Sequence, residues 1–202
     1  MASFGLFNFW SLGAEFRFFK LFGLSFDFGG ATVDVMHINK MLGSPIKTNK
    51  DGADIQKINA TFKHQEIRAV IYPFMGSFFI GAAIGNRDIA MSADANVDVS
   101  GTVGQVSGYL KVKNQYVTPQ LGWLAVFDNG FSIGTELGAQ LPISKGTGHR
   151  SIAILSTGGV PVSAITSSGG YKEVEKRLDD MIHTLQRQVF PFWNIIKIGW
   201  LF

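Results

Sequence analysis

Strict alternation of apolar and polar residues is the feature that most limits what this chain can fold into. From 131 to 143 the apolar positions include Leu137 and Leu141, and the intervening positions hold glycines and Glu136. Residues 117–127 alternate in the same way. An Asp-Asn-Gly sequence separates the two runs and is typical of a tight β-hairpin. A period of two places one face of each strand in apolar surroundings and the other in polar surroundings.

The same alternation recurs along most of the chain. Four further runs predict strands at 22–35, 62–72, 78–99 and 105–113. We expect tight turns near 20–21, 73–76 and 128–130, and long or Gly-rich connections at 37–57, 100–105 and 144–170. The apolar residues change face at Gly29–Gly30 and again after Asn86. A glycine pair at such a change indicates a β-bulge.

Composition and layout together favour a membrane-spanning barrel. The chain is 46% hydrophobic and 16% charged, and a soluble domain typically has about 25% charged residues. Short turns at one end and long loops at the other are the arrangement of transmembrane β-barrels. The predicted fold class is an all-β antiparallel meander closed into a transmembrane barrel of about eight strands. The residues expected to face lipid or another subunit are Phe78, Ile80, Ile84, Leu121, Trp123, Phe127, Phe131, Ile133, Leu137 and Leu141.

One segment has helical instead of strand periodicity. Residues at about 170–189 carry apolar side chains at steps of four and three, with serines and a Gly-Gly pair before them and Pro191 after them. This pattern predicts an amphipathic helix inserted before the last strand of a single domain covering 1–202. Its packing seam is expected to consist of Val174, Leu178, Met181, Leu185 and Val189.

The last six residues form an alternating, aromatic-tipped strand in which Lys197, Gly199, Trp200 and Phe202 occupy recognisable positions. This ending resembles the C-terminal signal of bacterial outer-membrane β-barrel proteins. Residues 68–85 and 121–139 also look like the short-turn hairpins of small barrels of this class. The resemblance implies a bacterial outer-membrane location. It also implies that the barrel-assembly machinery reads the last strand, which then closes the barrel.

Seven strands are clear from the pattern, whereas bacterial barrels of a single chain have even numbers. The eighth is expected either at 3–10 or at 151–165. A membrane-spanning helix at 69–85 is disfavoured because Pro73 and Gly76 interrupt it, and a hairpin explains the same residues. The first 20 residues lack a basic region and an unbroken apolar run, so we expect any export signal to have been removed.

The hairpin from 77 to 127 has arms about twice as long as the 9–11 residues that span a bilayer. Its apolar stripe continues to Val99 and would lie exposed to water unless something covered it. Either the helix and loops of this chain or another subunit must do so. We therefore expect a homo-oligomer, which could enclose membrane lipid between subunits.

The inward faces of the strands predict a filled barrel interior. They carry many glycines together with charged residues that could pair across the lumen: Glu15, Arg17, Arg68, Glu136 and Lys197. An eight-stranded barrel is just wide enough for such side chains. A narrow channel, with or without the helix as a plug, is the less favoured alternative.

Little in the sequence indicates catalysis or metal binding. The chain has no cysteine, and His37, His64, His149 and His183 are far apart without ligand-like spacing. Asp94, Asn96 and Asp98 share one strand face, but a flat strand is a poor cage for calcium. We expect no cofactor and no metal. A net charge of +3, scattered along the chain, gives no reason to expect nucleic-acid binding.

These features predict an integral outer-membrane barrel with a structural or lipid-organising role rather than an enzyme. The alternative is a small diffusion channel of porin type, and the third possibility is a lipid-modifying outer-membrane enzyme. A soluble lipocalin-like carrier would alternate similarly. It would, however, hold its apolar residues inward, and it does not explain the aromatic last strand.

Overall fold

The computed structural model describes residues 1–6, 10–34, 49–50, 53–99 and 101–200. Strands and helices occur in the order β1 (Ala2–Leu6), β2 (Trp10–Phe18), β3 (Phe22–Asp34), β4 (Asn49–Lys50), β5 (Ala53–Ile71), β6 (Phe78–Val99), β7 (Thr102–Val126), β8 (Phe131–Pro142), β9 (Thr147–Ser156), α2 (Val162–Ser167), α3 (Gly169–Arg187) and β10 (Phe190–Trp200).

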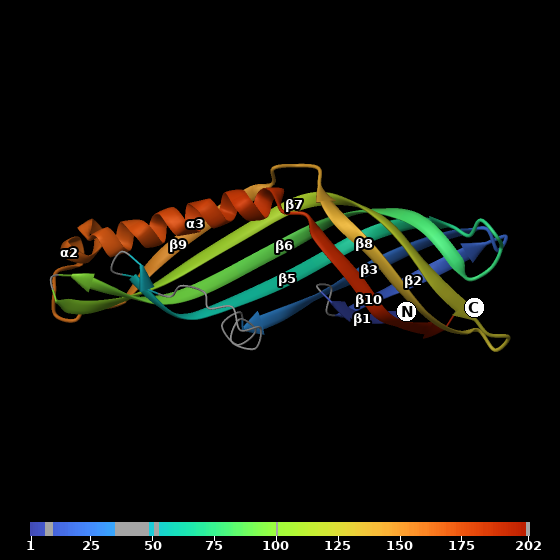
Figure 1. Ribbon diagram of the computed structural model, residues 1–202, viewed down its shortest axis with the longest axis horizontal. Coiled ribbons are helices and arrows are strands. Elements are labelled where there is room, and N and C mark those ends of the chain that lie inside the picture. The colour runs from blue at the N-terminus through green and yellow to red at the C-terminus, as the bar shows by residue number, and fades with distance from the viewer. Residues whose placement is uncertain (7–9, 35–48, 51–52, 100, 201–202) are drawn as a thin grey trace.

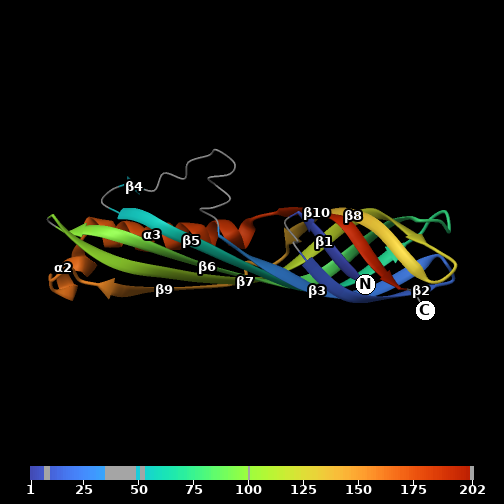
Figure 2. The same ribbon diagram turned by 90° about the horizontal axis from the view of Figure 1, so that it is seen from below.

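Eight of these strands close into an antiparallel barrel, which confirms the predicted fold class (Figures 1 and 2). Neighbouring strands pair around the ring in the order β1, β2, β3, β5, β6, β7, β8 and β10, and β10 pairs with β1 to close it. The eighth strand is thus β1, the first of the two expected positions. The other position, 151–165, contains the end of β9 and most of α2. Strand β9 pairs with β7 outside the barrel ring.

The barrel strands direct apolar side chains outward and polar ones inward. Outward residues such as Phe26, Ile84 and Trp123 are about half exposed, whereas inward Glu136 and Arg68 are almost fully buried. This arrangement is that of a barrel in lipid. It is the reverse of what the soluble carrier requires, so that alternative is wrong.

Beyond the barrel, at the end away from the short turns and at the left of Figure 1, strands β5, β6 and β7 continue as a protruding sheet, here called the extension. The direction from the short turns toward the extension is called up. These strands have 19, 22 and 25 residues, about twice the length that a bilayer requires. In the extension the polarity of the two faces is exchanged. On β7, for example, inward Leu110 and Val112 are fully buried, while Lys111 and Lys113 point outward.

The exchange occurs without any irregularity in the strands. The register of β3 with β2 and with β5 is unbroken through Gly29 and Gly30, and that of β6 with β7 is unbroken through Asn86. The predicted β-bulge at Gly29–Gly30 is therefore wrong. The apolar residues move to the other face because the surroundings change. The two glycines serve close packing instead: a Cβ on either would lie 2.1 Å from a neighbouring backbone oxygen.

Helix α3 covers the apolar inner face of the extension. Leu178 and Ile182 form a buried cluster with Leu110 and Val112, against which Val174, Met181 and Leu185 also pack. Ile165 of α2 joins a second cluster with Val97 and Val106. Of the two expected sources of cover, this chain's own helix is the one that the structure shows.

Polar contacts fix the start and the outer side of α3. The Ser168 side chain accepts a hydrogen bond from the Tyr171 amide at 3.2 Å and caps the start of the helix. Arg150 of β9 reaches Glu175 at 2.9 Å and Asp179 at 2.6 Å. The hydrogen bond to Glu175 raises the pKa of Arg150 above its usual value.

Two details of the helix differ from the sequence-based expectation. The helix ends at Arg187, so Val189 lies beyond it and is 41% exposed, and its place in the packing seam is a wrong prediction. Ile182, one step of four from Leu178, belongs to the seam instead. No helix in the described part of the chain is long and apolar enough to cross a membrane.

The contact between α3 and the extension yields a stability prediction. Leu178→Ala should remove about 2–5 kcal/mol of packing between helix and sheet, because Leu178 is 3% exposed. We expect faster tryptic cleavage at Lys176 and Arg177, measured by mass spectrometry of the fragments. The barrel itself should stay folded, so the mobility of the unheated variant on a gel should equal that of the unheated parent protein. Lys176→Ala on the exposed side of α3 is the control for packing, and equal cleavage of α3 at Arg177 in both variants would contradict the prediction.

Candidate functional site

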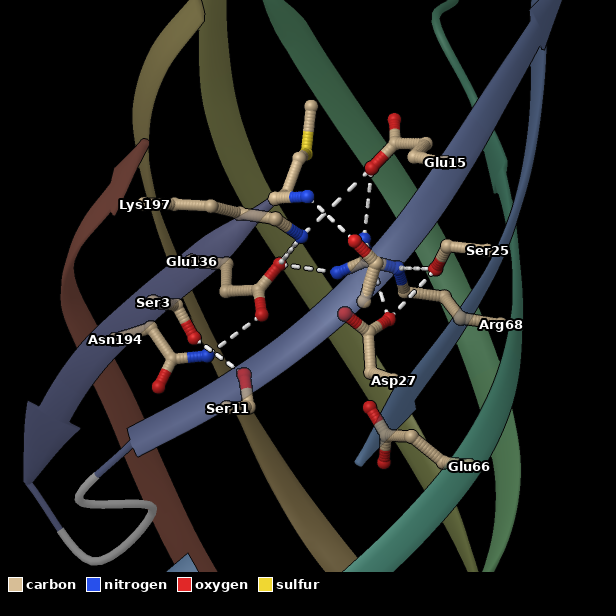
Figure 3. A network of polar contacts seen from close by, with 12 residues as sticks. Ser3, Ser11, Glu15, Ser25, Asp27, Glu66, Arg68, Glu136, Asn194 and Lys197 are labelled. Carbon is tan, nitrogen blue, oxygen red and sulfur yellow. Dashed lines mark hydrogen bonds and ion pairs between the residues drawn. The ribbon is translucent and has the colours of Figure 1, made fainter. Parts of the chain in front are cut away.

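The barrel interior holds a network of charged side chains centred on Arg68 (Figure 3). Arg68 of β5 is 1% exposed. Its guanidinium contacts Glu15 of β2 at 2.8 Å, Asp27 of β3 at 3.7 Å and Glu136 of β8. Its Nε donates to Ser25 Oγ at 2.9 Å. One cation thus connects strands on three sides of the lumen.

The last strand contributes the second cation of this network. Lys197 of β10 places its Nζ 3.1 Å from Glu136 and 3.7 Å from Glu15. Asn194, also on β10, donates to Glu136 Oε1 at 2.7 Å. Because β10 closes the barrel against β1, these contacts link closure of the ring to pairing of the internal charges. The predicted pairing of Glu15, Arg68, Glu136 and Lys197 across the lumen is what the structure contains.

Below the network, toward the short turns, an aromatic cluster fills the lumen. Tyr72 and Phe79 pack with Val70 and Leu124, and all four are buried. Arg17 lies over the Tyr72 ring at 3.7 Å and donates to the Gly76 carbonyl at 2.8 Å. Arg17 therefore closes the lower end instead of joining the central network.

Above the network, Phe62 and Phe190 meet at 6.0 Å between ring centroids. A void of about 30 Å³ remains between these rings, Arg87 and Phe192, enough for roughly two water molecules. Side chains therefore occupy the lumen at its lower, central and upper levels.

The end of α3 is held at the top of the barrel by two polar residues. Buried Arg87 donates to the Gln188 carbonyl at 2.8 Å and to Asn114 Oδ1 at 2.6 Å. Asn114 in turn donates to the Gln186 carbonyl at 3.2 Å. The last carbonyls of a helix lack partners within it, so these contacts end α3 and lead the chain into β10. No sequence pattern pointed to them, because β6, β7 and the helix end meet only in the fold.

The predicted lipid-facing residues all lie on the outer side of the barrel. Most are exposed, including Ile80, Leu121 and Leu137, while Phe131 and Ile133 are half-buried. Phe131 loses exposure to its neighbours, since it stacks on Phe127 and meets Trp200 at 5.2 Å. The remaining predicted members, Phe78, Ile84, Trp123 and Leu141, point outward as well.

The residues of the C-terminal signal divide between the two faces of β10. Lys197 points into the lumen, and Trp200 is 55% exposed on the outside. A Cβ at Gly199 would lie 2.5 Å from Met1 Cγ, so a larger residue there would require the Met1 side chain to shift. Phe202 lies outside the described residues.

The polar positions considered for ion binding are otherwise engaged. Asp94 accepts from Ser107 Oγ at 2.7 Å, and Asp98 accepts from the Gly101 amide at 2.8 Å. Within the described ranges, no three His, Asp or Glu side chains gather in a way that could hold a metal ion. His37 lies outside those ranges.

The fold and the belt of outward apolar side chains define the protein as an eight-stranded transmembrane β-barrel with a helix-covered extension. Its fold is similar to those of Acinetobacter baumannii CarO2 (13% sequence identity, 100% of this chain and 96% of that chain covered, TM-score 0.53) and CarO (13% identity, 100% and 95% covered, TM-score 0.49). No protein-family model matches the sequence, and no curated protein matches it.

The central network can be tested through stability. Arg68→Met leaves buried carboxylates without their main cation, which costs about 3–5 kcal/mol. We expect a lower midpoint of urea unfolding in detergent, followed by tryptophan fluorescence.

Arg177→Met serves as the matched control. Arg177 pairs with Glu173 on the surface of α3, where such a pair contributes about 0.5 kcal/mol at most. If Arg68→Met and Arg177→Met shifted the midpoint equally, the network would not be the internal support described here.

Proposed function

We propose that this protein is an outer-membrane barrel with a structural role, which anchors its extension in the membrane and conducts no solute through its lumen. The single observation that carries the proposal is the filled interior. A network of ion pairs crosses its centre, aromatic side chains occupy both ends, and α3 enters β10 at the upper opening.

The outer-membrane location rests on two supports. The apolar outward face fits a lipid bilayer, and the last strand carries the residues that resemble the assembly signal. We propose that the barrel-assembly machinery recognises Gly199, Trp200 and Phe202. Lys197, with its inward ion pairs, would act chiefly in closure.

Conductance tests the proposal. Purified protein inserted into planar bilayers should give no stepwise currents, because side chains occupy the lumen at its lower, central and upper levels. Flotation of the same protein with lipid vesicles, and its resistance to carbonate extraction, show that it has inserted. Reproducible current steps that scale in number with inserted protein would favour the diffusion channel instead.

Lipid organisation through self-association is the second part of the proposal. Because α3 occupies the inner face of the extension, a second copy would have to contact the outward belt or the outer face of the extension. We expect light scattering with detergent subtracted to give a mass several times 22.1 kDa, with lipid retained in the same sample. A lipid-free mass of one chain would exclude this second part and leave the anchoring role intact.

A further inference from the structure

The outer face of the sheet changes from apolar to charged in successive cross-strand rows. Register places Phe26, Ile67, Ile84 and Val117 side by side in one row. The next outward row up contains Phe28, Gln65, Asn86 and Gln115. The row above that contains Trp10, Gly30, Lys63, Asp88 and Lys113. Each step along a strand between these rows is about 7 Å.

The third row lies at the height of lipid headgroups. It is about 13 Å along the strands from the apolar row, or about 10 Å along the membrane normal for the usual strand tilt. Hydrocarbon contact ends at the amide row, where the outward side chains become polar. Charged side chains in the third row can therefore reach the polar layer of the bilayer without entering its core.

Three lysines and one carboxylate occupy this part of the surface. Asp88 lies 3.1 Å from Lys111 Nζ and 3.8 Å from Lys113 Nζ. Lys63 stands directly opposite Asp88 in the register and has no ion-pair partner among the described residues. Three ammonium groups and one carboxylate leave two positive charges. The contact with Asp88 raises the pKa of Lys111, which keeps it protonated.

A cavity of about 860 Å³ adjoins the cluster. Its lining includes Lys63, Asp88 and Lys113 together with Trp10 and Phe28, whose rings meet edge to face at 6.5 Å between centroids. Gly30 adds no side chain between Trp10 and Lys63. This volume falls in the range of sites for small organic molecules and exceeds what a bare ion needs.

We propose that Lys63 and Lys113, with Lys111 beside them at Asp88, bind the phosphate group of an anionic lipid whose headgroup enters this cavity and whose acyl chains lie on the outward belt. Lysine is a compact point charge suited to phosphate. The aromatic pair borders the acyl-chain side, as tryptophan does at membrane interfaces. The proposal rests on the membrane location proposed above and adds the class of lipid and the residues that select it.

Native mass spectrometry in a neutral detergent tests the proposal with two lipids, dioleoyl phosphatidic acid and dioleoyl phosphatidylcholine. We expect the protein to retain phosphatidic acid in preference to phosphatidylcholine. Lys63→Gln with Lys113→Gln should weaken that binding about 30-fold, since each lysine near a lipid surface contributes roughly fivefold. Asp88→Asn removes the only carboxylate of the cluster and should strengthen the binding of phosphatidic acid.

Lys172→Gln with Lys176→Gln is the matched control, since it makes the same charge change on the exposed side of α3. Equal binding of phosphatidic acid by this control and by the Lys63/Lys113 variant would overturn the proposal, as would weaker binding by Asp88→Asn. Competition between inorganic phosphate and phosphatidic acid is the second test. If inorganic phosphate displaced phosphatidic acid at equal concentration, the site would be one for free phosphate, and the lipid assignment would be wrong.

Carbonate-resistant insertion of each variant is checked in parallel, so that loss of folding is not taken for loss of binding. The two proposals fail separately. A protein that conducts ions and still selects phosphatidic acid contradicts only the sealed, structural role. A sealed barrel without lipid preference contradicts only the headgroup site.

Discussion

Three strands of this protein pass without a break from hydrocarbon into water, and this change of medium governs where side chains are placed. In the bilayer every backbone polar group must be paired within the protein, which a closed barrel achieves. Above the bilayer the same strands need an apolar core of their own. The exchange of polarity between inner and outer faces, at the level of Asn86 on β6 and Gln115 on β7, meets both demands on one sheet.

The inner network and the helix follow from that exchange. Within the membrane, the inward face is the only place left for polar residues, so Arg68, Glu136 and Lys197 must neutralise one another there. Above it, the inward face becomes apolar and needs a cover, which α3 supplies. Arg87 and Asn114 stand at the boundary between these two interiors and bind the helix end. Side chains occupy the lumen at its lower, central and upper levels, and the proposed anchoring role rests on that filling.

Much of this organisation could be predicted from the sequence, because alternation records the environment of each face. The barrel and the pairing of Glu15 with Arg68 follow from residue types at period two. The helix before the last strand follows from apolar steps of four and three, and the 128–130 turn follows from its Asp-Asn-Gly sequence. The apparent change of phase at Gly29–Gly30 is consistent with two structures. A bulge and a change of surroundings leave the same trace in a sequence, and only the unbroken register separates them.

Other features depend on contacts between distant segments. Strand β1 has five residues, too few to show a clear period, and its role depends on pairing with β10. Val189 continues the helical spacing, yet Arg87 binds the carbonyl of the residue before it and the helix has already ended. The residues of the lysine cluster come from β5, β6 and β7, so no local sequence motif predicts it.

Because β5, β6 and β7 run through both the barrel and the extension, a change in the tilt of the barrel also moves the extension. The β6–β7 ladder runs unbroken from the membrane into the extension, the β5–β6 ladder shifts register only between Ile55 and Lys57, and α3 packs on the part outside (Figure 2). A membrane-spanning segment longer than the local hydrocarbon thickness can tilt to fit it. Any such tilt swings the tip of the extension sideways in proportion to the length of the extension. A change in membrane thickness that tilted the barrel would therefore also redirect the extension.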